Sequence, residues 1–369
     1  MKRILILNYE FPPLGGGAAN ATYYFLKEFA KDPSLEIDLV TSSLDTYRTE
    51  QFAPNITIHY LDIGKKGNLH YQSNADLLRY AWRAYRYARR LVGRERFDLV
   101  HAFFGIPCGY IAMKLGLPYI VSLRGSDVPF YNARFYWLDM LFFRRMSRRI
   151  WKRANAVIAN SAALKELAYA SVPAQEIGVI YNGVATDEFL PAQGNAHDDL
   201  HLISTGRLIE RKGYRYLIEA LAGIEGVTLT LVGDGNQKSE LEALADTHGV
   251  RVQFAGSQRH EEIPALLAEA DVFVLPSLNE GMSNSVLEAM AAGLPIITTD
   301  TGGSAELVHD NGIIVPKADV AALRAATLTL KEDPALRATM ARRSRERALK
   351  MSWHAVAGEY RNVYHALQI

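Results

Sequence analysis

The sequence contains very little cysteine, with one residue, Cys108, among 369. A single thiol cannot form an internal disulfide, so the fold does not depend on a disulfide framework, and the composition fits a reducing compartment. Cys108 stands between Pro107 and Gly109, where we expect a small side chain that packs at a helix start. We therefore expect a cytoplasmic protein.

Long apolar runs are also absent. No uninterrupted apolar stretch approaches the roughly 18 residues that a membrane-spanning helix requires. The start of the chain is basic and then apolar, as in a signal peptide, but the apolar run Ile4–Leu7 ends after four residues and is typical of a first β-strand. Any membrane contact is therefore expected to be peripheral, on the inner face of a membrane.

Metal-binding and dinucleotide-binding motifs are missing as well. No Asp-x-Asp pair occurs, and no group of His or Cys residues has the spacing of metal ligands. The chain also lacks a convincing Gly-x-Gly-x-x-Gly with an acidic residue roughly 20 positions later, which argues against an oxidoreductase. We expect neither a metal nor another cofactor.

The net charge of +1 conceals a difference between the two halves of the chain. Residues 1–189 carry 24 Lys and Arg against 17 Asp and Glu, whereas residues 190–369 carry 17 against 23, giving charges of +7 and −6. A basic half indicates an anionic partner, such as a membrane surface or a phosphorylated acceptor. Nucleic acid is not expected, because no recognised binding motif accompanies the charge.

Short β-branched runs alternate with helical patterns along the whole chain, which predicts an α/β fold with parallel sheets. A chain of 369 residues forms about two domains. We assign residues 1–189 to the first Rossmann-like domain and 190–351 to the second, with a polar linker over Pro191–Asp199. The expected strands are 3–8, 37–41, 56–61, 99–103, 119–123, 156–159 and 178–181, then 202–205, 228–232, 251–255, 272–275, 296–299 and 313–315.

The most informative segment reads PSLNEGMSNSVLEAMAAGLP over Pro276–Pro295 and contains two carboxylates, Glu280 and Glu288. The apolar run before it predicts a buried strand, and Ser283–Ser285 supply N-cap residues for a helix. We therefore expect Glu280 on a loop and Glu288 in the first helical turn.

Backbone N–H groups at the start of that helix, in Asn284, Ser285 and Val286, would face a ligand beside both carboxylates. Such an arrangement suits a ligand that carries phosphate and hydroxyl groups, as a nucleotide-sugar does. An alternative is structural: Ser285 and Glu288 have the spacing of a capping box, in which the Glu bonds its own helix start. The spacing alone leaves both interpretations open.

Resemblance to a known family favours the first interpretation. Glu280, Gly281-Met-Ser, Glu288 and the following AMAAGLP closely resemble the paired-Glu signature of glycosyltransferase family 4, also described as glycosyl transferases group 1. The resemblance covers essentially the whole chain and is strongest over Thr205–Val315. It implies the GT-B fold, in which two Rossmann-like doubly wound domains face each other across a cleft. The final helix, about residues 352–369, would then pack back on the first domain.

The same resemblance implies a function. Family members are retaining enzymes that move a sugar from a nucleotide diphosphate-sugar to a hydroxyl acceptor. For this chain we favour a UDP-sugar, and the acceptor would be a glycan or a lipid-linked or cell-surface glycan precursor. By the same resemblance, the matching residues imply that Glu288 bonds the nucleotide ribose and that Glu280 lies by the donor sugar, with Met282, Ser283, Asn284 and Ser285 also bordering the donor.

A basic loop and a glycine cluster complete the expected donor site. Arg207 and Lys212 follow the first strand of the second half, and in the family the matching residues hold the donor diphosphate. Such charge-assisted hydrogen bonds are worth roughly 1.5 to 3 kcal/mol each and could neutralise the leaving diphosphate without a metal. Gly16 belongs to Gly15-Gly-Gly17 after the first strand, where a backbone without side chains can approach phosphate, although a glycine cluster is often only a tight turn.

The first half departs from the family pattern at one position. Many members have a His where this chain has Arg124, and that His contacts the donor sugar. An Arg cannot act as a general base at neutral pH, so Arg124 would bind a phosphate or carboxylate of the substrate. Asp127 and His101 are the nearby candidates for catalytic groups, although a lone His at a strand end is more often structural. Arg124 also keeps open a non-catalytic nucleotide-sugar-binding scaffold, against which the joint presence of the donor residues argues.

Two segments combine basic and aromatic residues, Arg79–Arg90 and Arg134–Arg153. Amphipathic helices of this composition can lie on anionic membranes, where each basic residue contributes about 1 kcal/mol. The alternative is that the aromatic side chains pack on the sheet and the arginines are solvated. We expect the first domain to contact an anionic membrane surface through one or both segments.

Overall fold

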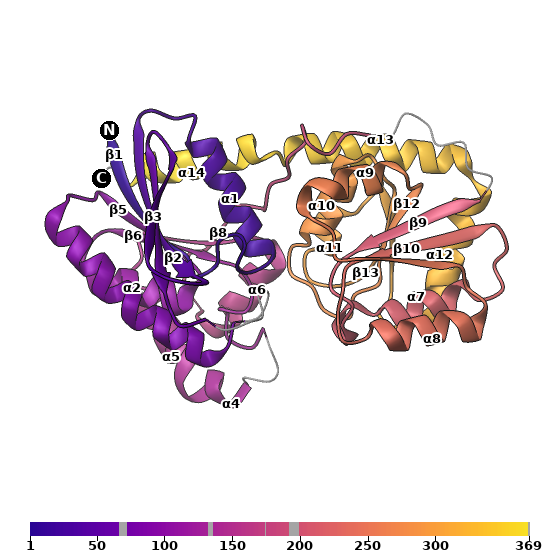
Figure 1. Ribbon diagram of the computed structural model, residues 1–369, viewed down its shortest axis with the longest axis horizontal. Helices are drawn as coiled ribbons and strands as arrows, with labels where there is room; N and C mark the ends of the chain where they lie inside the picture. The colour runs from indigo at the N-terminus through magenta and orange to yellow at the C-terminus, as the bar shows by residue number, and fades with distance from the viewer. Residues whose placement is uncertain (66–71, 132–135, 174, 192–198, 368–369) are drawn as a thin grey trace. The chain divides into compact units, whose positions relative to one another are not determined.

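The computed structural model describes residues 1–65, 72–131, 136–173, 175–191 and 199–367, and its secondary structure is drawn in Figure 1. The chain forms two compact units. Unit 1 comprises Met1–Asn182 and Trp353–Ile369, and unit 2 comprises Gly183–Ser352. Most of the linker predicted over Pro191–Asp199, residues 192–198, lies outside the described residues.

The first unit ends at Asn182, seven residues before the boundary inferred from the sequence at 189. The segment that follows is bound to the second unit through Arg345 of helix α13 (Pro334–Lys350). Arg345 Nη2 donates to the carbonyl of Thr186 at 2.9 Å, and its Nη1 donates to the carbonyl of Phe189 at 2.7 Å. The polar composition near 191 could not reveal these bonds, because their donor lies more than 150 residues later in the chain.

The sheet of unit 1 is parallel except at one edge. Its spatial order is β3-β4-β2-β1-β5-β6-β7-β8, and β3 alone pairs antiparallel, with β4. Strand β3 is not among the strands expected from the sequence, because its residues RTEQFA are largely exposed and show no apolar pattern. The strands are β1 Lys2–Leu7, β2 Leu35–Ser43, β3 Arg48–Ala53, β4 Ile56–Asp62, β5 Leu99–Phe103, β6 Tyr119–Leu123, β7 Ala156–Ala159 and β8 Gly178–Val179.

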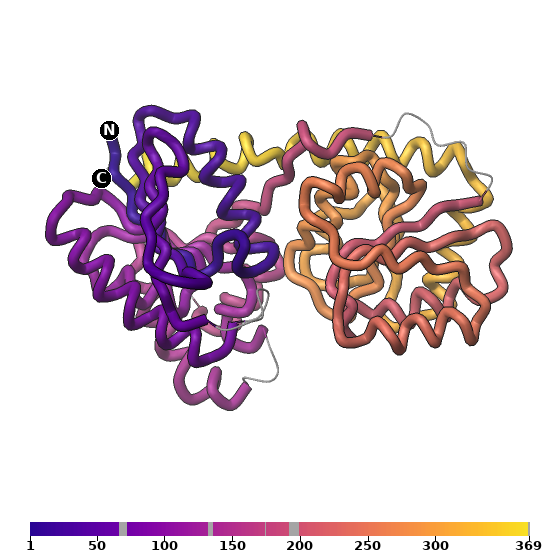
Figure 2. Tube along the Cα trace, in the orientation of Figure 1, coloured from indigo at the N-terminus to yellow at the C-terminus, as the bar shows by residue number. Residues whose placement is uncertain are grey.

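Helix α14 (Trp353–Ala366) packs within unit 1 against α1 (Gly17–Phe29), as the yellow and indigo segments of the trace in Figure 2 show. Its buried residues recur at helical spacing, and Trp353 stacks on Tyr24 with ring centroids 6.1 Å apart. The other helices of unit 1 are α2 Asn74–Arg94, α3 Tyr110–Leu115, α4 Tyr136–Leu138, α5 Arg144–Trp151 and α6 Ala162–Ser171, with π-helical turns at Gly105–Gly109 and Asp139–Phe143.

The sheet of unit 2 is fully parallel, with the order β11-β10-β9-β12-β13-β14. Its inner strands are runs of buried aliphatic residues, as expected for strands covered by helices on both faces. The strands are β9 Leu200–Thr205, β10 Val227–Val232, β11 Val252–Gly256, β12 Val272–Leu275, β13 Ile296–Thr299 and β14 Gly312–Val315. The other helices are α7 Tyr214–Leu221, α8 Lys238–His248, α9 Ile263–Ala268, α10 Asn284–Ala291, α11 Ser304–Leu307 and α12 Val320–Glu332.

Both units are therefore α/β with doubly wound sheets, which confirms the predicted fold class. In unit 2 the chain builds the sheet outward from β9 in one direction and then outward from β12 in the other. Ligands of such sheets bind at the carboxyl ends of the two strands where the order reverses. The loops after β9 and β12 are therefore the expected ligand-binding loops of unit 2. Among the helices formed by the described residues, none has the length and apolar character needed to cross a bilayer.

Candidate functional site

Four loops meet at the carboxyl edge of the unit 2 sheet, after β9, β10, β12 and β13. Backbone hydrogen bonds join them in pairs. The N–H of Leu208 donates to the carbonyl of Asp234 at 2.9 Å, and that of Leu278 donates to Arg211 at 2.8 Å. The N–H of Gly303 donates to Gly281 at 3.2 Å. The edge is therefore a connected surface of backbone.

Glycine is required where these loops touch. A Cβ at Gly233 would overlap the carbonyl of Gly206, and a Cβ at Gly302 would overlap the carbonyl of Glu280. Both glycines have positive φ, at 140° and 45°. Gly302 and Gly303 are not among the residues expected from the sequence, although a glycine pair three residues after a predicted strand is a signal that identifies such a loop.

Lys212 and Glu280 form an ion pair across the reversal of strand order. Lys212 Nζ lies 2.6 Å from Glu280 Oε1, and each side chain is only 11% exposed. Ser277 donates from its hydroxyl to the same carboxylate oxygen at 2.9 Å. Burial by itself raises the pKa of Glu280, but the charge and hydrogen bond of Lys212 outweigh it and hold the pKa below its ordinary value. The structure thus brings together two of the predicted site residues as a charged pair.

Helix α10 begins two residues earlier than the capping-box interpretation requires. Its N-cap is Ser283, whose hydroxyl accepts from the N–H of Val286 at 3.4 Å and lies 3.0 Å from the hydroxyl of Ser285. Glu288 therefore lies in the second turn, which corrects the expectation of the first turn. Ser285 is not the N-cap, so the capping box is excluded.

Glu288 has a different environment from Glu280. Among the described residues, no hydrogen bond or ion pair reaches its side chain. The residue retains partial exposure, yet protein surrounds the carboxyl group closely enough that burial raises its pKa to about 8. A carboxyl group without a protein partner beside a helix start can bond the hydroxyl groups of a ligand.

Three other predicted donor residues lie at the same edge of the sheet. Met282 is buried and lies beside Gly303, so its side chain packs between the loops after β12 and β13. Arg207 is exposed and directly follows Gly206 at the end of β9. Asn284 is the first residue of α10.

The remaining predicted site residues belong to unit 1. Gly16 is the N-cap of α1 and provides no side-chain cap, and a Cβ there would meet no atom within 4 Å. Arg124 donates from Nη1 to Asn182 Oδ1 at 2.7 Å, and its guanidinium carbon lies 4.6 Å from the ring centroid of Phe103. Burial lowers the pKa of Arg124 from its ordinary value.

Asp127 binds backbone groups of its own loop region. Its carboxylate accepts from the N–H groups of Gly105, Arg124 and Gly125 at 2.7, 2.9 and 3.0 Å. Burial raises the pKa of Asp127, and these backbone bonds oppose that rise. The residue holds the loop after β6 to the turn after β5.

His101 lies in the middle of β5 and is fully buried, which differs from the strand-end position expected from the sequence. Its Nδ1 lies 2.7 Å from the hydroxyl of Tyr364, and its Nε2 lies 2.8 Å from the hydroxyl of Ser122. Burial, with the charge of Arg124, lowers the pKa of His101 well below its ordinary value. The imidazole is thus a neutral member of the core beneath α14.

The two basic aromatic segments have different surroundings. Residues 79–90 lie in α2, whose Tyr80, Ala84 and Ala88 are buried against the core. Residues 134 and 135 of the second segment lie outside the described residues. From Tyr136 onward this segment exposes large apolar side chains: Tyr136, Trp137, Leu138, Met140, Leu141 and Phe142 are 46–73% exposed.

Comparison with known proteins gives matches over both units. Residues 15–188 match the model described as Glycosyltransferase Family 4, and residues 199–333 match the model described as Glycosyl transferases group 1. The chain is 36% identical over 289 residues to a glycogen synthase of Mycobacterium tuberculosis, which covers 73% of this chain and 69% of that protein.

Solved structures show the same fold. Sucrose-phosphate synthase from Thermosynechococcus elongatus superposes with a TM-score of 0.85 at 22% identity, over 100% of this chain and 99% of that one. HepE from Anabaena, solved in complex with UDP and glucose, superposes with a TM-score of 0.76 at 21% identity, over 99% and 100% of the two chains.

Proposed function

Because this chain belongs to glycosyltransferase family 4, we propose that it transfers a hexose from a UDP-sugar to a hydroxyl group of a glycan acceptor with retention of configuration. Its two α/β units have the GT-B fold. The chain is a glycosyltransferase of the hexosyltransferase type. We propose three further properties: the UDP-sugar donor, the glycan acceptor and the retained configuration.

The buried pair of Lys212 and Glu280 is the observation that carries the proposal. It lies where the strand order reverses, the place where doubly wound sheets bind ligands. An ammonium group has three donors, and Glu280 and its hydroxyl partner fix the lysine without exhausting them. Lys212 is therefore preorganised to donate to a diphosphate oxygen as negative charge develops on the leaving group.

The neighbouring residues have complementary roles in this proposal. Arg207, exposed at the end of β9, pairs with the diphosphate, and the start of α10 contributes backbone dipoles. Glu288, which has no protein partner among the described residues, accepts hydrogen bonds from the ribose hydroxyls. The two cations supply the charge that a metal would otherwise provide, so we propose that transfer needs no metal.

UDP and a glycan are the donor nucleotide and the acceptor class that the relatives favour. The Anabaena protein HepE has been crystallised with UDP and glucose, and the mycobacterial relative is a glycogen synthase. Tyr136–Phe142 form an exposed apolar surface beside the arginines of α5, and this surface supports a lipid-linked acceptor. Aromatic and basic side chains together favour an anionic membrane. We therefore extend the proposal to peripheral binding at this surface.

Release of nucleoside diphosphate tests the proposal. UDP-glucose, UDP-galactose, GDP-mannose and ADP-glucose are each supplied with oligosaccharide acceptors, and NMR of the product determines the anomeric configuration. We expect release from a UDP-sugar and a retained configuration. Lys212→Met should lower kcat by about 100- to 1,000-fold, the usual cost of removing a group that stabilises developing charge.

Two variants separate chemistry from folding. Lys212→Met with Glu280→Gln removes both charges, so thermal unfolding should recover while turnover stays low. Arg215→Gln removes a charge from the adjacent helix, where Arg215 pairs with Glu219 and lies 5.9 Å from the ring centroid of Tyr216, and should keep turnover within about twofold. Exclusive use of GDP- or ADP-sugars would overturn the UDP assignment, and an inverted product would overturn retention.

A further inference from the structure

A cavity of about 330 Å³ lies in unit 1, between helix α2 and the loop after β2. Tyr47 and Trp82 line it and are 52% and 59% exposed, so part of each aromatic side chain is accessible. The cavity is large enough to hold a sugar residue, and none of the residues that the proposed transfer uses lines it.

One face of α2 supplies the positive charge of this cavity. The other face, with Tyr80, Ala84 and Ala88, is buried against the core. Five residues of α2 line the cavity, and four of them follow the spacing i, i+3, i+4 and i+7, so these four project from one side of the helix. They are Arg83, Arg86, Tyr87 and Arg90, and Trp82 is the fifth.

The charge exceeds what the cavity itself neutralises. Asp62, at the end of β4, is the one acidic side chain among the described residues that line it, and it pairs with Arg83 at 3.0 Å. The guanidinium carbon of Arg86 lies 4.7 Å from the ring centroid of Trp82, which presents a cation beside an aromatic face. Arg86 and Arg90 thus add positive charge that no acid of the lining offsets.

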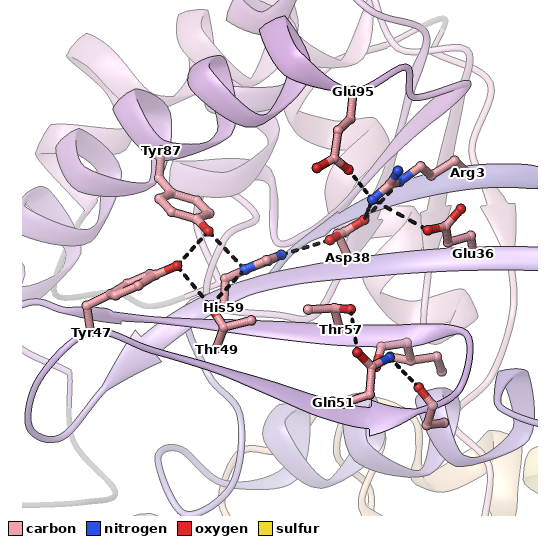
Figure 3. Close-up of polar contacts among 12 residues, drawn as sticks. Arg3, Glu36, Asp38, Tyr47, Thr49, Gln51, Thr57, His59, Tyr87 and Glu95 are labelled. Atoms are coloured by element: carbon pink, nitrogen blue, oxygen red, sulfur yellow. Dashed lines mark hydrogen bonds and ion pairs between the residues drawn. The ribbon is translucent and has the colours of Figure 1, made fainter.

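A chain of polar contacts runs from the exposed Tyr47 into the core and holds Tyr47 and Tyr87 in place, as Figure 3 shows. The hydroxyl of Tyr87 lies 2.9 Å from that of Tyr47 and 2.9 Å from His59 Nδ1. His59 Nε2 lies 2.8 Å from Asp38 Oδ1, and Arg3 donates to Asp38 Oδ2 at 2.9 Å. Because His59 and Asp38 are buried, the position of Tyr87 is anchored in the core, and little ordering remains for a ligand to impose.

We infer that this cavity binds a sugar residue that carries a phosphate or carboxylate group, as a subsite for the acceptor glycan. Arginine pairs with both anions in a bidentate manner, and the exposed aromatic faces pack on the apolar face of a sugar ring. The assignment to the acceptor rests on the proposed function, whereas the binding of anionic sugars does not. The basic aromatic pattern of Arg79–Arg90 is then explained by a ligand cavity rather than by a membrane surface.

Calorimetric titration of the full-length protein tests this subsite with four probes: glucuronate, glucose 6-phosphate, glucose and inorganic phosphate. We expect the two anionic sugars to bind at least tenfold more tightly than glucose and than phosphate. Arg86→Gln with Arg90→Gln, and separately Trp82→Ala, should each weaken that binding at least tenfold. Arg89→Gln removes one positive charge from an exposed position of α2 that does not line the cavity, and should change affinity less than twofold.

Each contrary result has a defined meaning. Equal binding of phosphate alone would reduce the cavity to a general anion site, and equal binding of glucose would remove the role of the arginines. Affinity unchanged by Arg86→Gln with Arg90→Gln would overturn the proposal. Binding that persists while no UDP-sugar is used would refute the proposed function alone. Transfer to an acidic glycan with an unchanged KM in that double variant would refute the acceptor assignment alone.

Discussion

Two glutamates of one short motif have opposite electrostatic properties in this protein. Glu280 is held charged by Lys212, whereas Glu288 has no protein partner among the described residues and its pKa rises to about 8. The difference matches two tasks: a fixed charge that positions a cation, and an unsatisfied group that a ligand can bond. Sequence spacing treats both as equivalent carboxylates.

The raised pKa of Glu288 predicts a pH-dependent stability. The folded state retains this proton up to about pH 8, whereas the unfolded chain loses it near 4.5, so burial costs stability progressively between those values as pH rises. Glu288→Gln removes the cost, so the variant should gain more thermal stability over the wild type at pH 8 than at pH 5. Thermal unfolding without nucleotide at the two pH values measures this difference.

The exposed Glu346 of α13 provides a matched control, because Glu346→Gln should give the same small change at both pH values. We also expect Glu288→Gln to weaken UDP binding by about tenfold, equivalent to the loss of one hydrogen bond. A stability difference that does not vary with pH would contradict the assigned environment of Glu288.

At the scale of elements, α14 completes the core of unit 1. Its Tyr360 and Tyr364 contact Phe25 and Phe29 of α1, and their hydroxyls reach Ser122 and His101 inside the sheet. Helix α14 thereby joins α1 to strands β5 and β6 of the unit 1 sheet. Helix α14 therefore stabilises unit 1 through polar contacts as well as apolar packing.

Tyr364→Phe tests this contribution. The change removes the hydroxyl that contacts His101 Nδ1 and leaves a buried nitrogen without its partner, which costs about 1 to 3 kcal/mol. Denaturant unfolding of the full chain, followed by hydrogen exchange in β5 and β6, should show a loss of that size in unit 1. Tyr110→Phe changes a more exposed tyrosine with no hydrogen bond among the described residues and should be nearly neutral. Equal effects of the two substitutions would show that the His101 contact contributes nothing.

At the scale of the whole molecule, charge and exposed apolar surface favour the same partner. Residues 1–189 have a charge of +7, and the same half exposes Trp137, Leu141 and Phe142 beside the arginines of α5. Together these features suit a surface that is both anionic and apolar. The residues after 189 have a charge of −6 and are not expected to bind an anionic membrane.

Cosedimentation with lipid vesicles tests this prediction. The protein should pellet with vesicles that contain phosphatidylglycerol at low salt, and the bound fraction should fall as salt rises. Vesicles of phosphatidylcholine alone should pellet little of the protein. Trp137→Ser with Phe142→Ser should reduce binding several-fold, whereas Trp82→Ser in α2 should not. Failure to pellet with anionic vesicles at low salt would overturn the membrane proposal.

Much of the fold follows from the sequence, because its signals are local. β-branched runs that alternate with helical periods specify parallel strands, and every strand of unit 2 was expected within a few residues of its position. The polar strand β3 could not be predicted, because its pairing with β4 depends on backbone bonds and leaves its side chains largely exposed.

Local patterns along the chain show which residues follow strands, and therefore that Arg207, Lys212 and Glu280 lie at one sheet edge. The tertiary structure decided that Lys212 pairs with Glu280, that Glu288 remains unpartnered, and that His101 is enclosed by a helix from the end of the chain. The physical reason is that periodicity reports neighbours along the chain. Charge state and burial depend on groups that folding brings together, such as His101 and Tyr364, 263 residues apart.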